Sequence, residues 1–398
     1  MSRPQCYAIL LLGFILGLYL EAQPTLQQVW ARHDQFVMSG PGKPVVIDPS
    51  NSHNFKGKHG QMVRGWDVGA PDATPVLWWN GGPGDAADPA WDVNCFDDPK
   101  RYRHLEIDQP GTGQSAWIPG WRPEDTVDDA ATFLRSRGIT KPILVTGWSW
   151  GSTMALLFAQ RHPDLVQGVI VGGVWTNTAA EVEAYLGASG SRSWMAGVSE
   201  VFRASSGGRG TACDLHAAIR AGRGGKALVQ AYSDAESLQA GEGRIPRKPL
   251  VEAIPSVQSK PVDLATETDS DVRFAYIESE MMCRGQRGQW SLHLRFPKRL
   301  ADVPLIVIQG RYDQICTPEV AKQVHRAWPG TQKLLVPFNG GHWGFKGPDK
   351  ETRALAGLNL SNTDDEKLSR ATSLHFGNSR LLNGAAIDCL ATFSPAAP

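Results

Sequence analysis

Residues Pro142-Ile143-Leu144-Val145-Thr146-Gly147-Trp148-Ser149-Trp150-Gly151 decide the fold of this chain. The first five form an apolar run typical of a buried strand. Residues 152–161 have the composition of a helix, which is expected to end at His162-Pro163. Between them lies a G-x-S-x-G pattern. Glycines on both sides of Ser149 allow a sharp reversal that leaves the serine exposed at the start of the helix. The stretch therefore predicts a nucleophilic serine, with an ordinary Gly-Ser turn as the alternative.

Strands and helices alternate on both sides of this turn. Helices are expected at residues 123–137 and 317–328, and a leading hairpin from Val45-Val46-Ile47 and residues 62–66. Further strands, most of them ending in a glycine loop, are expected at residues 74–79, 102–108, 166–174, 303–308 and 334–338. Apolar strands joined by helices predict an α/β fold with a mostly parallel sheet and helices on both faces.

The alternation is lost between about residues 180 and 300, where helical fragments at 180–186 and 226–239 are separated by glycine and proline. This segment predicts an inserted, largely helical cap over the carboxyl edge of the sheet, where open α/β sheets bind ligands. The expected organisation is a core of residues 23–179, a cap of residues 180–300 and a second core part of residues 301–398. The second part includes a C-terminal extension to which the sequence assigns no role.

The N-terminal 22 residues resemble a signal peptide. Arg3 precedes an apolar run from Cys6 to Leu20, and Ala22 offers a small residue for cleavage. We therefore expect a secreted or lumenal protein that begins near Gln23, with an uncleaved membrane anchor as the alternative. The sequon Asn359-Leu360-Ser361 is compatible with secretion.

Charge composition excludes some partners. The 398 residues hold 40 Lys and Arg against 40 Asp and Glu, with an isoelectric point near 7.1. Without a dense basic run, nothing favours nucleic-acid binding or a stable membrane partner. The oligomeric state stays open.

Cysteine and histidine spacing argues against metal chemistry. No C-x-x-C or His-x-x-x-His pair occurs, so the sequence predicts neither a metal site nor a cofactor. Beyond the signal peptide the number of cysteines is odd, so at least one thiol is expected to stay unpaired, and spacing does not reveal the pairing. These cysteines are Cys95, Cys213, Cys283, Cys316 and Cys389.

Three reactive residues, Ser149, Asp313 and His342, each follow a predicted strand. A serine hydroxyl needs a base to take its proton, and an imidazole performs this well when a carboxylate orients it. The chain order Ser, Asp, His is that of α/β-hydrolases. A glycine loop, Asn80-Gly81-Gly82-Pro83-Gly84, follows an earlier strand and can bring bare backbone N–H groups close to a ligand.

Several segments resemble motifs of the prolyl aminopeptidases, also called proline iminopeptidases. The glycine loop resembles their HGGPG, residues 108–115 resemble DQRGxGxS, and residues 147–153 resemble GGSWGST. Residues 310–313 with Cys316 and Pro318 resemble GRYDxxCP, and Gly341-His342 resembles the terminal histidine. The resemblance implies an α/β-hydrolase with a helical cap that removes N-terminal proline from small peptides.

By this resemblance, Ser149 attacks the carbonyl, His342 carries the proton and Asp313 orients His342. The backbone N–H groups of Gly82 and Trp150 are expected to form the oxyanion hole. The family anchors the substrate amine with a cap glutamate, and the segment that resembles its motif offers Glu278, with Glu280 as the alternative.

This sequence departs from the family at several positions. Asn80 and Pro110 replace a histidine and an arginine of the loops, and the cap motif has Glu280 and Met281 where the family has histidine and tyrosine. In that family the cap determines the specificity for proline, so two rival functions stay open. One is an esterase or amidase acting on substrates without a free amine, and the other is a non-catalytic binding protein on a hydrolase scaffold.

Overall fold

A computed structural model describes residues 47–92, 102–186, 211–240, 258–311, 313–338 and 341–342. Its centre is an eight-stranded sheet with the order β1-β2-β4-β3-β5-β6-β7-β8, in which β1, β2 and β4 pair antiparallel and all pairs from β4 to β8 are parallel. The strands are β1 (Ser52–Lys56), β2 (Met62–Val68), β3 (Thr74–Trp79), β4 (Tyr102–Ile107), β5 (Ile143–Trp148), β6 (Val166–Gly172), β7 (Leu305–Gly310) and β8 (Lys333–Phe338). The predicted mostly parallel sheet is confirmed.

The leading hairpin forms, but its first strand was placed wrongly. Residues 45 and 46 lie outside the described residues, Ile47 is not in a strand, and β1 begins only at Ser52. Phe55 of β1 stacks on Phe133 of α4 with ring centroids 5.5 Å apart. The strand is formed by antiparallel pairing of Ser52–Lys56 with β2.

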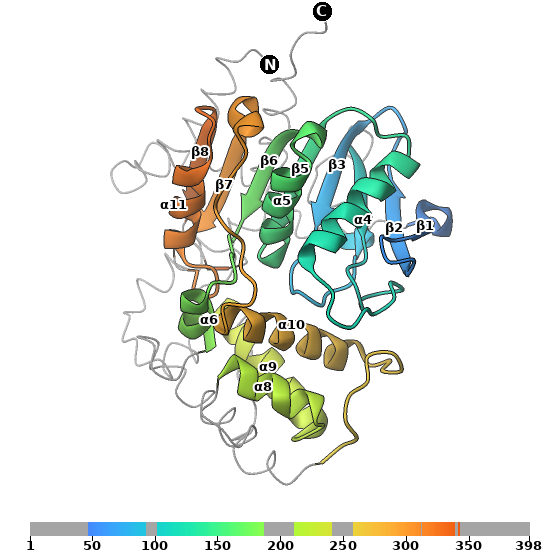
Figure 1. The fold of residues 1–398 in the computed structure, drawn as a ribbon, viewed down its shortest axis with the longest axis vertical. Coiled ribbons are helices and arrows are strands. Elements are labelled where there is room, and N and C mark those ends of the chain that lie inside the picture. The colour runs from blue at the N-terminus through green and yellow to red at the C-terminus, as the bar shows by residue number, and fades with distance from the viewer. Residues whose placement is uncertain are drawn as a thin grey trace, which may run out of the picture.

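Helices cover the sheet and build the cap. The core helices are α3 (Pro89–Asp92), α4 (Pro123–Ser136), α5 (Trp150–Arg161) and α11 (Pro318–Ala327). The cap helices are α6 (Ala179–Leu186), α8 (Ala212–Arg220), α9 (Gly225–Ala240) and α10 (Ser270–Gln286), and short 3-10 turns are η1 (Pro49–Asn51), η3 (Pro163–Leu165) and η5 (Lys298–Asp302). In Figure 1 the cap helices gather at the end of the sheet to which the strand arrows point. The carboxyl edge of the sheet therefore faces the cap.

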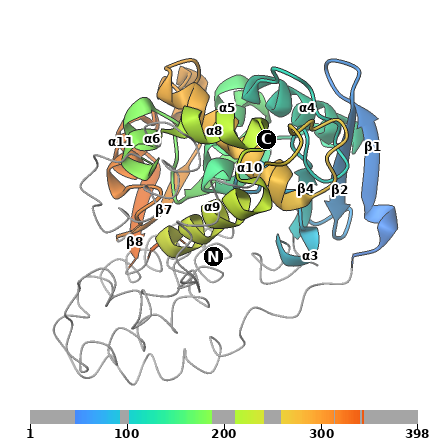
Figure 2. The ribbon, with the colours of Figure 1, turned by 90° about the horizontal axis from the view of Figure 1, so that it is seen from below.

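The two faces of the sheet bury different sets of side chains. Helices α4, α5 and α11 pack on the face that carries Leu77, Val145 and Val307. The opposite face buries a smaller cluster around Trp78 and Ile306. Figure 2 shows α3 on the side of the sheet away from α4. Within the described residues, no helix is long and apolar enough to cross a bilayer.

Helix α10 is fixed to both the core and the cap. Arg273 donates from Nε to the carbonyl of Gly111 at 2.7 Å, and Asn177 donates from Nδ2 to the carbonyl of Met281 at 2.9 Å. A disulfide between Cys213 and Cys283 joins α8 to α10. Cys316 is buried, while Cys95 and Cys389 lie outside the described residues. These contacts hold α10 to the core and to the cap, where Figure 2 shows it beside α8 and α9.

Candidate active site

The turn between β5 and α5 holds Ser149 in a strained conformation. Its φ of 57° and ψ of −128° are unusual for a residue with a side chain. A Cβ on Gly151 would lie 1.9 Å from the carbonyl oxygen of Trp79, and one on Gly147 would lie 2.2 Å from the carbonyl oxygen of Gly151. Only glycine fits at both positions, so the G-x-S-x-G pattern is required by the close approach of β3, β5 and α5.

Asp313 and His342 form a buried hydrogen-bonded pair after β7 and β8. His342 Nδ1 lies 2.9 Å from Asp313 Oδ2, and the two residues are 2% and 3% exposed. The other carboxylate oxygen of Asp313 accepts backbone N–H bonds from Ile315 at 2.9 Å and Cys316 at 2.8 Å. Gln309 Nε2 also donates to Asp313 Oδ2 at 3.3 Å. These donors fix the carboxylate as an acceptor, which is the role needed to orient an imidazole.

Contacts around Ser149 bring the serine turn and His342 together. The serine N–H donates to the carbonyl of Gly172 at 3.0 Å, and Trp148 donates from Nε1 to the carbonyl of His342 at 3.0 Å. A Cβ on Gly173 would lie 3.1 Å from His342 Cε1. The ends of β5 and β6 and the residues after β8 therefore meet at one place.

The glycine loop after β3 lies against the same turn. A Cβ on Gly81 would lie 3.7 Å from Ser149 Cβ, and Gly82 adopts a φ of +96°. Trp150 is the first residue of α5, where a backbone N–H has no partner within the helix. The loop and this helix N-terminus provide the two predicted positions, Gly82 and Trp150, from which N–H groups could stabilise an oxyanion.

Glu278 is a buried carboxylate on α10. It is 2% exposed, and the hydroxyl of Tyr232 donates to its Oε2 at 2.7 Å. Burial raises the pKa of Glu278 well above its ordinary value, and the nearby negative charges of Glu236 and Asp85 raise it further. Among the described residues no ion pair involves Glu278. This acid therefore lies where a cation would be stabilised.

Helix α10, which carries this carboxylate, packs against the glycine loop. A Cβ on Gly84 would lie 3.0 Å from Phe274 Cα and 3.4 Å from Ile277 Cβ. The residue after Gly84 is Asp85, which contributes to the negative field at Glu278. The cap carboxylate and the predicted oxyanion loop are thus parts of one contact region.

Glu280 has a different environment. Its Oε1 pairs with Arg284 Nη2 at 2.5 Å, one turn further along α10. Residues two apart on a helix point to different sides, because each residue turns the helix by about 100°. The structure therefore favours Glu278 over Glu280 as the anchor, because Glu280 already pairs with a cation of its own helix, whereas Glu278 has no ion pair among the described residues and interacts with Asp85, the residue after the glycine loop.

One group of metal-ligating side chains lies close together within the described residues. Asp313, Cys316 and His342 have ligand atoms within 4.8 Å of one another. The carboxylate and the imidazole of this group are already hydrogen-bonded to each other. The group is therefore part of the candidate catalytic site.

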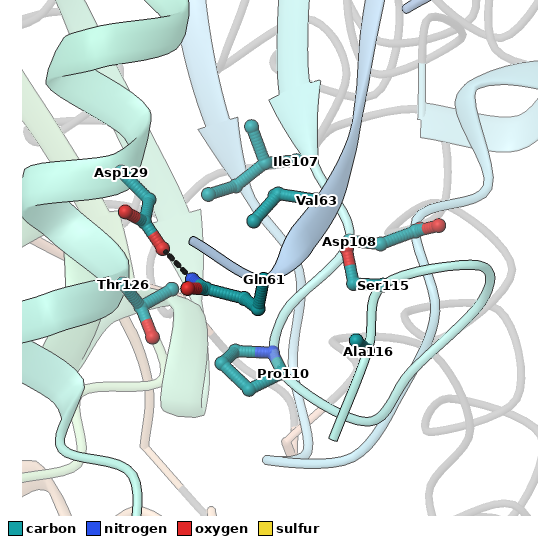
Figure 3. Close-up of a pocket in the computed structure, with 9 residues that line it drawn as sticks. All are labelled: Gln61, Val63, Ile107, Asp108, Pro110, Ser115, Ala116, Thr126 and Asp129. Atoms are coloured by element: carbon teal, nitrogen blue, oxygen red, sulfur yellow. Dashed lines mark hydrogen bonds between the residues drawn. The ribbon is translucent and has the colours of Figure 1, made fainter. Parts of the chain in front are cut away.

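A separate pocket lies beside the second glycine loop (Figure 3). Its walls come from β2, β4, α4 and the loop that carries Pro110 and Ser115, and Gln61 points toward Asp129 there. Neither Ser149, Asp313 nor His342 lines this pocket. It is distinct from the candidate active site.

Sequence reasoning missed several residues that support the site: Gln309, Tyr232 and the disulfide partners Cys213 and Cys283. Tyr232 and the two cysteines bind partners far away in the chain, and Gln309, although close to Asp313 in sequence, also accepts a hydrogen bond from the distant Val174 N–H, so no local pattern marks them. A signal for burial of Glu278 was available, because Ala275, Met281 and Met282 lie at helical spacing on the same side.

A family model described as the alpha/beta hydrolase fold matches residues 74–347. The chain therefore belongs to the α/β-hydrolase fold family. Its resemblance to the prolyl aminopeptidases is confirmed by curated relatives. Proline iminopeptidase of Arabidopsis thaliana is 29% identical over 306 residues, which cover 74% of this chain and 76% of that protein. Those of Xylella fastidiosa and Neisseria gonorrhoeae are each 28% identical, covering 70% and 71% of this chain and 86% and 87% of theirs.

Proposed function

We propose that this protein is a serine peptidase that releases N-terminal proline from small peptides. The observation that carries the proposal is Glu278, a buried carboxylate with like charges nearby, on the helix that covers the glycine loop. Relatives named proline iminopeptidase support the substrate class.

The reaction proceeds in two acyl-transfer steps. Ser149 Oγ attacks the carbonyl carbon of proline while His342 takes the hydroxyl proton and Asp313 stabilises the imidazolium. The carbonyl oxygen becomes an oxyanion held by the N–H groups of Gly82 and Trp150. The C–N bond then breaks, and His342 gives its proton to the leaving amine. Water, activated in turn by His342, hydrolyses the prolyl ester, releasing proline and restoring Ser149.

Glu278 selects substrates that carry a free amine. A carboxylate removed from water beside Glu236 and Asp85 is unfavourable until a cation neutralises it, and the protonated N-terminus of a peptide supplies that charge. Proline carries its charge within a ring, so one fixed anion beside the scissile carbonyl can position it. A neutral ester gains nothing from this anion.

A panel of proline amide and neutral ester substrates tests the proposal. Wild type should cleave a chromogenic proline amide, and Glu278→Gln should lower kcat/KM for it by at least about a hundredfold while changing ester hydrolysis less than twofold, since truncating a buried charged partner costs several kcal/mol. Equal losses on both substrates would make Glu278 structural. A loss in Glu280→Gln but not in Glu278→Gln would move the anchor to Glu280.

A fluorophosphonate probe tests the nucleophile separately. The probe should label wild type and not Ser149→Ala, since only the serine alkoxide forms the covalent bond. Labelling that persists in Ser149→Ala would exclude Ser149. Absence of both labelling and turnover in folded wild type would favour the non-catalytic alternative.

We place this activity in the secretory pathway or outside the cell. The apolar run before Gln23 motivates this assignment. The disulfide between Cys213 and Cys283 supports it, because disulfides persist in oxidising compartments.

A further inference from the structure

The glycine loop of the oxyanion site is closed by one side chain. Asn80, at its start, donates from Nδ2 to the carbonyl of Asp85 at 2.9 Å, across the segment Gly81-Gly82-Pro83-Gly84. Glycine-rich backbone has many conformations to lose, so it needs such a bond to hold one shape. The resembled family has histidine at the position of Asn80. In this chain, the loop is therefore closed by an asparagine amide in place of an imidazole.

Gln109 joins this closed loop to the other half of the oxyanion site. Its Oε1 accepts a hydrogen bond from Trp150 Nε1 at 2.9 Å. Its Nε2 donates to Asn80 at both Oδ1, at 3.3 Å, and the backbone carbonyl, at 3.4 Å. An indole N–H can only donate, so the amide oxygen of Gln109 must face Trp150 and its NH₂ must face Asn80.

The whole connection is shielded from water. Trp150, Gln109 and Asn80 are 0%, 1% and 7% exposed. At the far end Trp150 packs against Trp290, with ring centroids 5.5 Å apart, and Trp290 donates from Nε1 to Glu124 at 3.1 Å. Solvent has little access to replace a lost bond here, and an unsatisfied buried polar group costs more than an exposed one.

We propose that Gln109 is a positioning residue that holds the two halves of the oxyanion site in register. One N–H comes from the loop that Asn80 closes, and the other is the backbone N–H of Trp150, whose side chain Gln109 binds. An oxyanion is stabilised only when both donors point at the same oxygen, so their relative position determines the rate. This inference rests on the acyl-transfer chemistry of the proposed function and does not depend on the identity of the amine.

Gln109→Met tests the proposal with a side chain of similar length that neither donates nor accepts strongly. We expect kcat to fall about tenfold to a hundredfold for a proline amide and a neutral ester alike, with KM within twofold, because misplaced donors lose transition-state stabilisation alone. The affinity for a prolyl boronate, which mimics the oxyanion, should fall by a similar factor, while binding of proline itself should stay within twofold.

Gln61→Met is the matched control. Gln61 also has a hydrogen-bonded amide, which donates to Asp129 Oδ2 at 2.7 Å in the separate pocket of Figure 3. Its replacement removes the same chemical groups from a place that no proposed catalytic residue lines. We expect kcat within twofold of wild type, so a loss specific to Gln109 would reflect the oxyanion site.

Trp150→Phe provides a second, independent route. It removes the indole N–H but keeps an aromatic ring and the backbone N–H, so it breaks the same connection even if Gln109→Met does not fold. The kcat of Trp150→Phe should fall as in Gln109→Met, and the double variant should lose no more than either alone.

Two results would overturn the inference. One is folded Gln109→Met and Trp150→Phe enzymes that both keep kcat within twofold of wild type. The other is losses that multiply in the double variant, since the residues would then act separately. Either outcome in an enzyme that still cleaves proline amides leaves the proposed function intact. A wild-type protein that is inert to substrates and to the fluorophosphonate probe would instead refute the proposed function.

Discussion

Replacing Glu278 by glutamine should make the free enzyme more stable at neutral and alkaline pH. Burial, then the charge of Glu236, raises the pKa of Glu278 above its ordinary value of 4.5. The folded protein therefore keeps a proton that the unfolded chain releases as the pH rises above 4.5. The free energy of unfolding of wild type must then fall with rising pH until the pH passes the folded-state pKa.

The size of this pH-dependent loss of stability follows from the one proton that folded Glu278 retains and the unfolded chain releases. The loss approaches about 1.4 kcal/mol for each pH unit between the unfolded and folded pKa values. Glutamine has no such titration and keeps an oxygen that accepts the Tyr232 hydroxyl. The two proteins should therefore be similar in stability near pH 4.5, and the advantage of Glu278→Gln should grow toward pH 8.

Urea unfolding followed by tryptophan fluorescence at pH 4.5, 6, 7 and 8 measures this difference. Glu280→Gln is the control on the same helix, because it breaks the ion pair with Arg284 and should gain no stability at pH 8. An uncleavable analogue of a proline amide, added at 100 times its Kd for wild type, should raise the free energy of unfolding of wild type by about 2.7 kcal/mol. The same concentration should raise that of Glu278→Gln only slightly. Parallel stability curves for wild type and Glu278→Gln across this pH range would refute the reasoning.

Three further outcomes are expected. Asp313→Asn should lower kcat about 10⁴-fold with an unchanged circular dichroism spectrum, since an asparagine misorients the His342 imidazole; a loss below tenfold would exclude this role. Replacing Cys213 and Cys283 together by serine should cost roughly 4 kcal/mol in urea unfolding, from the 70-residue separation the disulfide closes, and unchanged stability would contradict that estimate. N-terminal sequencing of the mature protein should begin near Gln23, whereas a membrane-bound chain starting at Met1 would establish the anchor.

The sequence predicts the core well because its signals are local. An apolar strand that ends in a glycine loop is recognisable within about ten residues, and β5 with the Ser149 turn follows this pattern. Asp313 and His342 are found the same way, each after a predicted strand. Parallel strands bring their carboxyl ends to one edge, so the sheet itself assembles residues that lie far apart in the chain.

The supporting residues could not be predicted because their partners are distant. The bond between Gln109 and Trp150 requires knowing that β4 and β5 both flank β3. The disulfide requires that α8 pack on α10. The position of β1 also involves a distant partner, because Phe55 stacks on Phe133 of α4, and no local pattern reveals this contact.

The contacts of α10 join the proposed amine-binding residue to the loops beside the catalytic serine. Arg273 of α10 holds the carbonyl of Gly111, in the loop that follows Gln109, and Phe274 packs on Gly84. The helix that carries Glu278 therefore contacts both glycine loops, one of which supplies the predicted oxyanion donor. Because of these contacts, the distance between a substrate amine bound at Glu278 and the reacting oxygen would be fixed by the glycine loop that stabilises that oxygen. Selectivity can change through the cap carboxylate while the core chemistry persists, provided that α10 keeps these two contacts.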